Sequence, residues 1–316
     1  MFHVRVILRD ADSARNEIGK CMPTEFSRKL KRGTKLLISS AFLAGDAIWG
    51  GARRLLGKKP HPSWTTLYYH SIASEQRSHF AKQMDLLLRF TIPVSVTDRC
   101  STTMRAKRYS SITFDDAFET VIDNAIPELR KRGIPATIFV TSRVLGQPAS
   151  WWPEDAPEAR HRIMSAEQVR GLPTDLISIG SHTLTHPMLT LLNEREARLE
   201  LSASKAELEE LLGREVPLFS FPFSAFNGQL VEWCRQAGYN HIFAGQTVPS
   251  NTIANQKSVL RGRIGVEPTD WTLEFCLKAL GAYRWLPYAV SLKRNILSNG
   301  LVRNACVLLL GAAATD

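Results

Sequence analysis

The chain has 316 residues, 44% of them hydrophobic, which suits one large α/β domain with extensions or two domains. It contains no stretch of about 18 apolar residues, which argues against a standard membrane span. Five cysteines, at positions 21, 100, 234, 276 and 306, are scattered and never form a C-x-x-C pair. Neither a disulfide framework nor a thiolate zinc site is therefore indicated.

The net charge of +10 is concentrated at the two ends of the chain. Residues 1–60 carry +8, residues 61–280 carry −1 and residues 281–316 carry +3. A nearly neutral middle without a basic, aromatic groove argues against a nucleic-acid partner. The basic, Leu-rich ends favour a folded domain over 61–280 that is attached to an acidic surface, for which anionic lipid is the simplest candidate.

The N-terminal extension, residues 1–60, is predicted to be basic and amphipathic. Its apolar stretch, 36–50, has only 15 residues and contains Asp46, and Arg53 and Arg54 after it suit an export signal poorly. An interfacial helix with its apolar face in one leaflet is favoured, and a helix packed on the domain is the alternative. The segment 281–316 repeats the pattern and predicts a basic amphipathic helix. We expect a peripheral protein on the cytoplasmic face of a bacterial membrane.

From residue 65 onward, short β-branched and aromatic runs alternate with amphipathic segments. Strands are predicted at 65–69, 94–96, 111–114, 136–140, 176–179, 218–221, 242–243 and 259–264. Helices are predicted at 80–90, 117–132 and 193–212, the last with Asn193 and Glu196 as a capping box and Gly213 as its stop. Alternating strands and helices imply a parallel sheet covered by helices, and about seven such units favour a (β/α) barrel over an open sheet.

The strand predicted at 111–114 ends on two adjacent carboxylates, Asp115 and Asp116. Burying both is costly unless each has a cation, a metal or hydrogen-bond donors nearby. A helix cap is the alternative, but it explains one aspartate and not both. In parallel barrels the active site gathers at the C-terminal ends of the strands, and His70, His182 and His186 follow other predicted strands.

The spacing of His182 and His186 allows one turn of chain to bring both imidazoles to a single ion. Pro187 places His186 in a turn and not within a long helix. The spacing alone is weak, since two unrelated exposed histidines also explain it. Together with a carboxylate at a neighbouring strand end, it predicts a site for Zn²⁺ or a similar divalent ion that keeps open coordination positions.

Two motifs make the resemblance to a known family specific. T-F-D-D at 113–116 and S-H-T-L-T-H-P at 181–187 resemble the first two motifs of NodB-type polysaccharide deacetylases, carbohydrate esterase family 4. The resemblance extends over about 65–280. It implies a distorted (β/α) barrel and removal of N-acetyl groups from amino sugars with one divalent metal, for which zinc is favoured and cobalt, manganese or nickel are alternatives.

The resemblance also implies roles for individual residues. Asp116, His182 and His186 correspond to the metal ligands, and Asp115 corresponds to the general base. The backbone N–H of Phe223, in F-S-F-P-F, matches the oxyanion donor of the third motif, although a strand followed by a proline turn also explains that run.

The chain departs from the family pattern at the proton donor. The histidine of a late motif is missing, because His241 lies in no matching motif. Some family members are permuted, with the corresponding strand first, so we hypothesise that His70 is the general acid. A structural histidine is the alternative.

Three further features concern the surroundings of the site. Ala117 replaces the glycine that usually follows the two aspartates, which puts the turn geometry in doubt. The arginine that commonly precedes the third-motif proline is absent, and Arg263 is a candidate to orient Asp115 and to lie on the substrate side. Trp151 and Trp152 could stack on a sugar ring or pack their own loop.

The sequence therefore predicts a metal-dependent hydrolase that cleaves a carbon–nitrogen amide bond. Its expected substrate is an N-acetylated, or similarly acylated, amino sugar of a polysaccharide or a lipid-linked glycan. The alternative is a catalytically silent barrel that binds glycan, which the missing late histidine supports.

Overall fold

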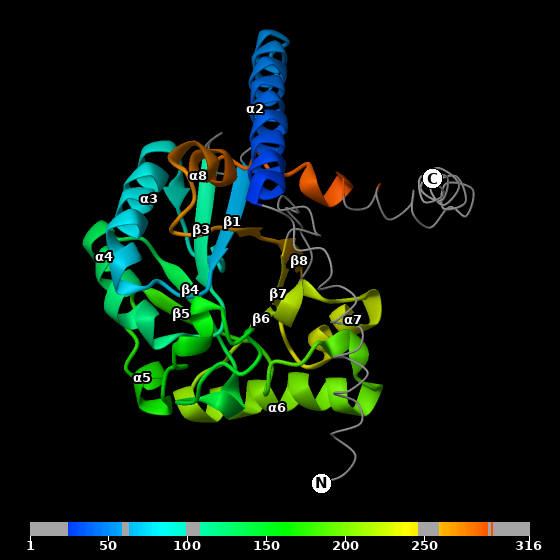
Figure 1. Cartoon of the computed structure of the whole chain (residues 1–316). Coiled ribbons are helices and arrows are strands. Elements are labelled where there is room, and N and C mark those ends of the chain that lie inside the picture. The colour runs from blue at the N-terminus through cyan, green and yellow to red at the C-terminus, as the bar shows by residue number, and fades with distance from the viewer. Residues whose placement is uncertain (1–24, 59–62, 99–107, 246–258, 290–291, 293–316) are drawn as a thin grey trace, which may run out of the picture.

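The computed structural model describes residues 25–58, 63–98, 108–245, 259–289 and 292, and shows a parallel sheet surrounded by helices (Figure 1). The strands are β1 (Ser63–Tyr69), β2 (Ile92–Pro93), β3 (Arg108–Phe114), β4 (Ala136–Val140), β5 (Ile177–Ser181), β6 (Leu218–Ser220), β7 (His241–Ala244), β8 (Val259–Gly262) and β9 (Ile264–Gly265). The α-helices are α2 (Glu25–Leu55), α3 (Arg77–Phe90), α4 (Ile126–Arg132), α5 (Ala166–Arg170), α6 (Glu194–Leu212), α7 (Gly228–Gln236) and α8 (Thr272–Ala279).

The sheet closes almost completely on itself. Its strand order is β8-β7-β6-β5-β4-β3-β1-β9, with β2 paired to β3, and the pairings are parallel. Only Arg263 separates β8 from β9, yet β8 pairs with β7 and β9 pairs with β1. One extended segment thus joins the two ends of the sheet, which confirms the predicted α/β class with a distorted (β/α) barrel.

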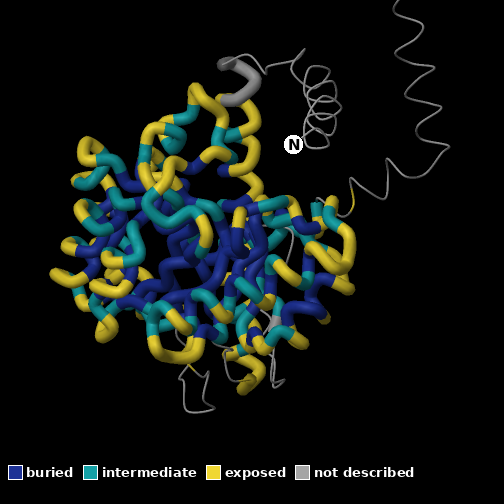
Figure 2. Tube along the Cα trace, turned by 90° about the horizontal axis from the view of Figure 1, so that it is seen from below, coloured by how far each residue is buried: buried dark blue, intermediate teal, exposed yellow. Residues whose placement is uncertain are grey.

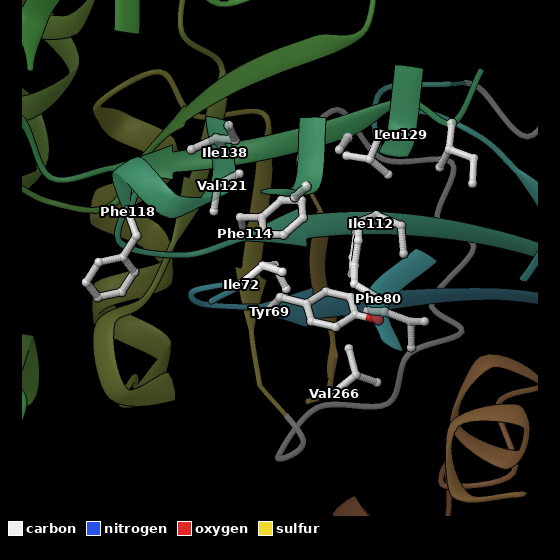
Figure 3. Packing of buried hydrophobic residues seen from close by; sticks show 14 of the residues in the cluster. Tyr69, Ile72, Phe80, Ile112, Phe114, Phe118, Val121, Leu129, Ile138 and Val266 are labelled. Atoms are coloured by element: carbon white, nitrogen blue, oxygen red, sulfur yellow. The ribbon is translucent and has the colours of Figure 1, made fainter. Parts of the chain in front are cut away.

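The space between the strands and their covering helices is filled by apolar side chains. Every residue of β4 is buried, as expected for a strand covered on both faces. The ring centres of Tyr69 and Phe80 are 5.3 Å apart, and those of Tyr69 and Phe114 are 5.7 Å apart (Figure 3). Figure 2 shows the buried chain at the centre and the exposed chain around it. This packing fixes the strand ends from which the candidate site is built.

Helix α6 follows its sequence signals closely. The Asn193 side chain accepts a hydrogen bond from the Glu196 N–H at 3.0 Å, the Glu196 carboxylate accepts one from the Asn193 N–H, and Gly213 ends the helix with a φ of 64°. The helix predicted over 117–132 begins later than expected. Asp116 and Ala117 have φ values of 68° and 55°, so the chain turns before helical structure starts at Glu119.

The strand predicted at 94–96 is also displaced. The described strand at this place is β2, although the Val94 N–H still donates to the Ser110 carbonyl at 2.8 Å. β2 is a two-residue strand with a proline, which removes one ladder donor and limits the pairing to this short stretch. Strand β5 runs on through Gly180 and Ser181, so His182 follows it directly.

Helix α2 lies beside α8 and extends beyond the barrel (Figure 1). No helix among the described residues has the length and apolar character needed to cross a bilayer. Of the basic helix predicted over 281–316, residues 290–291 and 293–316 lie outside the described part. The division into 1–60, 61–280 and 281–316 stays a prediction.

Candidate active site

The residues singled out from the sequence lie at the C-terminal ends of neighbouring strands. His70 follows β1, Asp115 and Asp116 follow β3, and His182 follows β5. The Asp115 N–H donates to the Tyr69 carbonyl at 2.9 Å, which ties the end of β3 to the end of β1. The His182 N–H donates to the Val140 carbonyl at 2.8 Å and ties β5 to β4. Backbone hydrogen bonds therefore hold this rim in register.

Asp116, His182 and His186 form a buried group suited to a metal ion. One possible ligand atom from each residue lies within 4.8 Å of the others. Asp116 Oδ1 is 3.2 Å from His186 Nε2 and 3.6 Å from His182 Nε2. Asp116 Oδ1 has no hydrogen-bond partner although it is buried, so an acceptor is left facing two imidazole nitrogens. One carboxylate and two imidazoles are a donor set that fits Zn²⁺ and related divalent ions.

Each histidine is held in an orientation that suits this use. The Nδ1 atom of His182 is 2.8 Å from the Ser220 carbonyl, which requires a proton on Nδ1 and leaves the lone pair on Nε2. Burial lowers the pKa of His182 to about 4, so its imidazole is neutral at neutral pH. The His186 ring is stacked on Trp151, with centres 4.2 Å apart, and meets the Phe223 ring edge-on at 4.7 Å.

The loop between the two histidines is fastened by a residue that the sequence analysis did not identify. Glu200, in α6, accepts hydrogen bonds from the Leu184 N–H at 2.8 Å, the Thr185 N–H at 3.1 Å and the Thr185 hydroxyl at 2.6 Å. The His186 N–H donates to the Thr183 hydroxyl at 3.0 Å. Glu200 falls within the predicted helix 193–212, but no sequence signal connects it with the loop.

Trp151 and Trp152 contact the metal-ligand candidate Asp116 directly. Their indole N–H groups donate to Asp116 Oδ2 at 3.3 Å and 2.9 Å respectively. Both indoles thus hold one carboxylate oxygen and leave the other facing the histidines. Packing, one of the two alternatives for these tryptophans, is present, and His186 covers one face of Trp151. Contact with a sugar stays a prediction.

Asp115 is paired with Arg263 across the barrel. Two hydrogen bonds of 2.7 Å each join the guanidinium to the two carboxylate oxygens of Asp115, so the expected contact between these residues is present. The guanidinium also donates to the Thr113 hydroxyl at 3.0 Å and to the Ser220 hydroxyl at 2.6 Å. Burial, the largest single influence, would raise the pKa of Asp115, but the charge and hydrogen bonds of Arg263 together with smaller contributions from His182 and His70 outweigh it, and the pKa is lowered.

Arg263 is buried beside Asp115, among aromatic rings. It is only 1% exposed, and the rings of Tyr68, Phe139 and Phe243 surround its guanidinium at 4.8, 5.1 and 6.0 Å. These contacts fit the expected role of Arg263 in orienting Asp115, and contact of Arg263 with substrate stays a prediction. Its place at the joint between β8 and β9 explains why it reaches the barrel interior.

His70 and Phe223 lie on the same rim. The His70 ring meets Trp152 edge-on at 4.9 Å and Tyr68 at 5.6 Å. Phe223 follows β6 in a short turn, Pro222–Ser224, with a φ of 54° and a side chain that is 51% exposed. His70 is thus linked to the metal-ligand candidates through Trp152, and Phe223 through His186. Their roles as acid and oxyanion donor stay predictions.

Part of the chain is similar in sequence to known polysaccharide deacetylases. Residues 103–242 match the family model described as polysaccharide deacetylase. The protein YxkH of Bacillus subtilis, provisionally assigned as a polysaccharide deacetylase, is 26% identical over 157 residues, which are 50% of this chain and 51% of that protein. An uncharacterised 30.6 kDa protein of Geobacillus stearothermophilus is 25% identical over 140 residues, 44% of this chain and 46% of that one. The chain spans about half the length of the curated relatives it matches.

Solved structures share the fold. IcaB from Ammonifex degensii aligns with a TM-score of 0.56 at 23% identity, over 69% of this chain and 99% of that one. A de-N-acetylase from Aggregatibacter actinomycetemcomitans aligns with a TM-score of 0.53 at 19% identity, over 66% and 96% of the two chains. The motifs, the family match and the fold agree, and the resemblance inferred from the sequence is confirmed.

Proposed function

We propose that this chain, whose residues 103–242 match the polysaccharide deacetylase family, is a metal-dependent hydrolase of N-acyl amino sugars. The reaction would cleave the amide bond between an acetyl, or similar acyl, group and the sugar nitrogen. The observation that supports this most strongly is the juxtaposition of two carboxylates with different partners. Asp116 faces two imidazoles, whereas Asp115 is held by an arginine and keeps a negative charge beside them.

Asp116, His182 and His186 would hold the ion, with zinc favoured and cobalt, manganese or nickel as alternatives. A divalent ion held there would lower the pKa of a water molecule and polarise the acyl carbonyl. The neutral imidazole of His182 offers a lone pair without first losing a proton. The indoles of Trp151 and Trp152 would keep Asp116 oriented toward the histidines when the ion leaves.

Asp115 would accept the proton of the attacking water. A general base must be ionised before it accepts a proton, and the paired charge of Arg263 holds Asp115 in that form. The bidentate geometry also fixes the carboxylate plane, because two parallel hydrogen bonds leave no rotation. We propose that Arg263 replaces the arginine missing from the third motif.

The remaining needs of the reaction are an oxyanion donor and a proton for the leaving amine. The backbone N–H of Phe223 is the candidate donor, and its left-handed φ of 54° sets the direction of that peptide. His70 is the candidate acid, because it stands on the rim beside Trp152. His70→Ala should then lower turnover by about a hundredfold or more while the metal stays bound.

We propose an N-acetylated sugar on a lipid carrier, or a surface polysaccharide during its assembly, as the substrate. The support is the basic, Leu-rich character of both ends of the chain, which favours work at an acidic surface. A soluble oligosaccharide fits these ends less well. We propose the cytoplasmic face of the membrane as the place where the protein acts.

Two variants separate the proposed roles. His182→Gln should lose both bound metal and acetate release from N-acetylglucosamine oligosaccharides. Asp115→Asn should keep the metal and lose acetate release by about a hundredfold or more. Full binding of the oligosaccharide without acetate release, by protein carrying one metal per chain, would contradict the proposal and favour a silent glycan-binding barrel.

A further inference from the structure

Helix α2 has two faces with different surroundings. Arg32, Leu36, Ser39 and Leu43 recur every three or four residues, so they lie on one side of the helix. This side meets the barrel: Leu36 and Ser39 are buried, and Leu43 packs on the same apolar cluster as the barrel core. The opposite side of α2 is turned away from the barrel.

Directional contacts fix which side of α2 faces outward. Arg32 Nε donates to the Glu274 carboxylate at 2.6 Å, and its guanidinium lies 4.1 Å from the ring centre of Trp271. Trp285 Nε1 donates to the Ser39 hydroxyl at 2.9 Å. Because these bonds require particular side-chain directions, α2 cannot rotate about its axis without breaking them.

The outward side carries a row of exposed apolar residues. Leu30, Leu37, Ile48 and Leu55 are 60%, 75%, 74% and 91% exposed. They are spaced by seven, eleven and seven residues, and each of these steps returns to within about 20° of the same direction on an α-helix. A second exposed row runs beside the first and contains Ile38, Trp49 and Leu56. Such a continuous apolar face marks an interaction surface.

The charge of the helix selects the occupant of this surface. Lys31, Lys35 and Arg54 are exposed on α2, and residues 1–60 as a whole carry +8. A second copy of this helix would bring like charges together, and so would the basic segment 281–316 of the same chain. An anionic lipid surface offers both an apolar layer and opposite charge, and no described helix has the character needed to span it.

We propose that the outward apolar face of α2 lies in the headgroup region of an anionic bilayer, with its axis along the surface, while the opposite face holds the barrel there. Trp49 is suited to this depth, because an indole has an apolar body and a polar N–H. The exposed basic residues of α2 add attraction to anionic headgroups. This attachment is independent of the catalytic proposal, since the docking face shares no residue with the candidate active site.

Sedimentation of the full-length chain with lipid vesicles tests this attachment. The probes are vesicles of phosphatidylcholine alone and of phosphatidylcholine with phosphatidylglycerol at about 3:1, which presents the anionic surface that basic segments favour. The wild type should sediment with the anionic vesicles at low salt. The triple variant Leu37→Gln, Ile48→Gln, Leu55→Gln should bind the anionic vesicles at least about tenfold more weakly than the wild type. The double variant Lys31→Gln, Lys35→Gln should lose affinity for the anionic vesicles and not for vesicles of phosphatidylcholine alone.

A matched variant controls for the general loss of surface leucines. The control is a second triple variant, which replaces three exposed leucines outside α2: Leu88→Gln, Leu191→Gln and Leu199→Gln. This variant should bind the vesicles as the wild type does. Equal thermal midpoints in the two triple variants would show that both are folded. The fluorescence of the wild type should shift to the blue on anionic vesicles, and Trp49→Phe should reduce that shift while binding persists.

Two results would overturn the attachment. In the first, the Leu37, Ile48 and Leu55 variant binds anionic vesicles as strongly as the wild type. In the second, the wild type ignores both kinds of vesicle and is a dimer by light scattering, and the variant is a monomer. The face would then belong to a contact between copies of the chain.

Discussion

At the scale of single residues, the candidate site separates two adjacent carboxylates through their partners. Asp115 accepts two hydrogen bonds from Arg263, whereas Asp116 accepts two from indoles and turns its other oxygen to the histidines. The burial of both aspartates is thus compensated by different means. The residues that surround the carboxylates should therefore affect different measurable properties.

Replacing Arg263 with lysine should slow the reaction without removing the metal. A lysine keeps the charge but cannot form two parallel bonds to Asp115. We expect turnover to fall by about ten- to a hundredfold. Arg263 lowers the pKa of Asp115, so weakening this contact raises that pKa, and the acidic limb of the pH–rate profile should move to higher pH.

Arg261→Lys is the matched control for Arg263→Lys. Arg261 lies two residues earlier in β8 and donates to the Val96 carbonyl. Its variant should keep the wild-type rate and pH profile. An unchanged rate and profile in Arg263→Lys would show that Arg263 does not orient Asp115.

Replacing Trp152 with phenylalanine should weaken metal binding. The change removes the 2.9 Å hydrogen bond to Asp116 Oδ2 and retains most of the ring. Loss of a partner of a metal ligand typically lowers affinity by about ten- to a hundredfold. Competition with a chelating dye measures that affinity. Trp271→Phe, at an exposed tryptophan beside α8, is the control, and equal affinities in all three proteins would contradict this role.

At the scale of elements, strand β5 shows how packing sets the position of a ligand. Gly180 lies two residues before His182, and a Cβ at this position would be 2.5 Å from the Phe139 ring and 2.9 Å from Leu218 Cβ. The close approach of β4, β5 and β6 therefore requires a residue without a side chain. The ligand histidine leaves the strand directly after this contact.

Gly180→Ala should destabilise the barrel and disturb the site together. Overpacking of this kind costs about 2 kcal/mol of unfolding free energy. Urea denaturation measures this loss, and metal content per chain should fall as well because His182 moves. Gly228→Ala, where an added Cβ meets nothing within 4 Å, should change neither quantity. If Gly180→Ala had the stability of the wild type, β4 and β6 would be able to move apart from β5 and accommodate the added methyl group.

The sequence predicted some elements well because their signals are local. The cap at Asn193 and the stop at Gly213 define α6 within a few residues. The helix predicted over 117–132 starts two residues later, at Glu119, because Asp116 and Ala117 adopt positive φ values, for which Ala has no intrinsic preference. That turn is imposed by the surrounding site and cannot be read from propensity.

At the scale of the whole molecule, the candidate site depends on closure of the barrel. The segment 259–265 joins β7 to β1 and carries Arg263 into the interior opposite Asp115. The types and spacing of Asp116, His182 and His186 predicted that these side chains come together, and the structure groups them. The indole contacts and the Arg263 geometry arise between positions far apart in the sequence, so only the folded chain shows them.

The stability of the metal-free protein should fall as the pH drops from about 6.5 to about 4. Burial lowers the pKa of His182 to about 4, whereas the unfolded chain keeps a value of about 6.5. The unfolded chain therefore binds a proton in this window that the folded chain does not, and roughly 3 kcal/mol of unfolding free energy is lost. Urea denaturation at several pH values should show a flatter profile for His182→Gln. Parallel profiles for the two proteins would mean that His182 does not titrate in this way.

The most direct test of the central claim is acetate release from N-acetylglucosamine oligosaccharides as metal is returned to chelator-stripped protein. The rate should rise with added zinc or cobalt and level off at about one ion per chain, as a single site with open positions requires. Asp116→Ala should release no acetate at any loading. Equal rates before and after metal return, or no acetate at any metal loading, would contradict the assignment as a metal-dependent deacetylase.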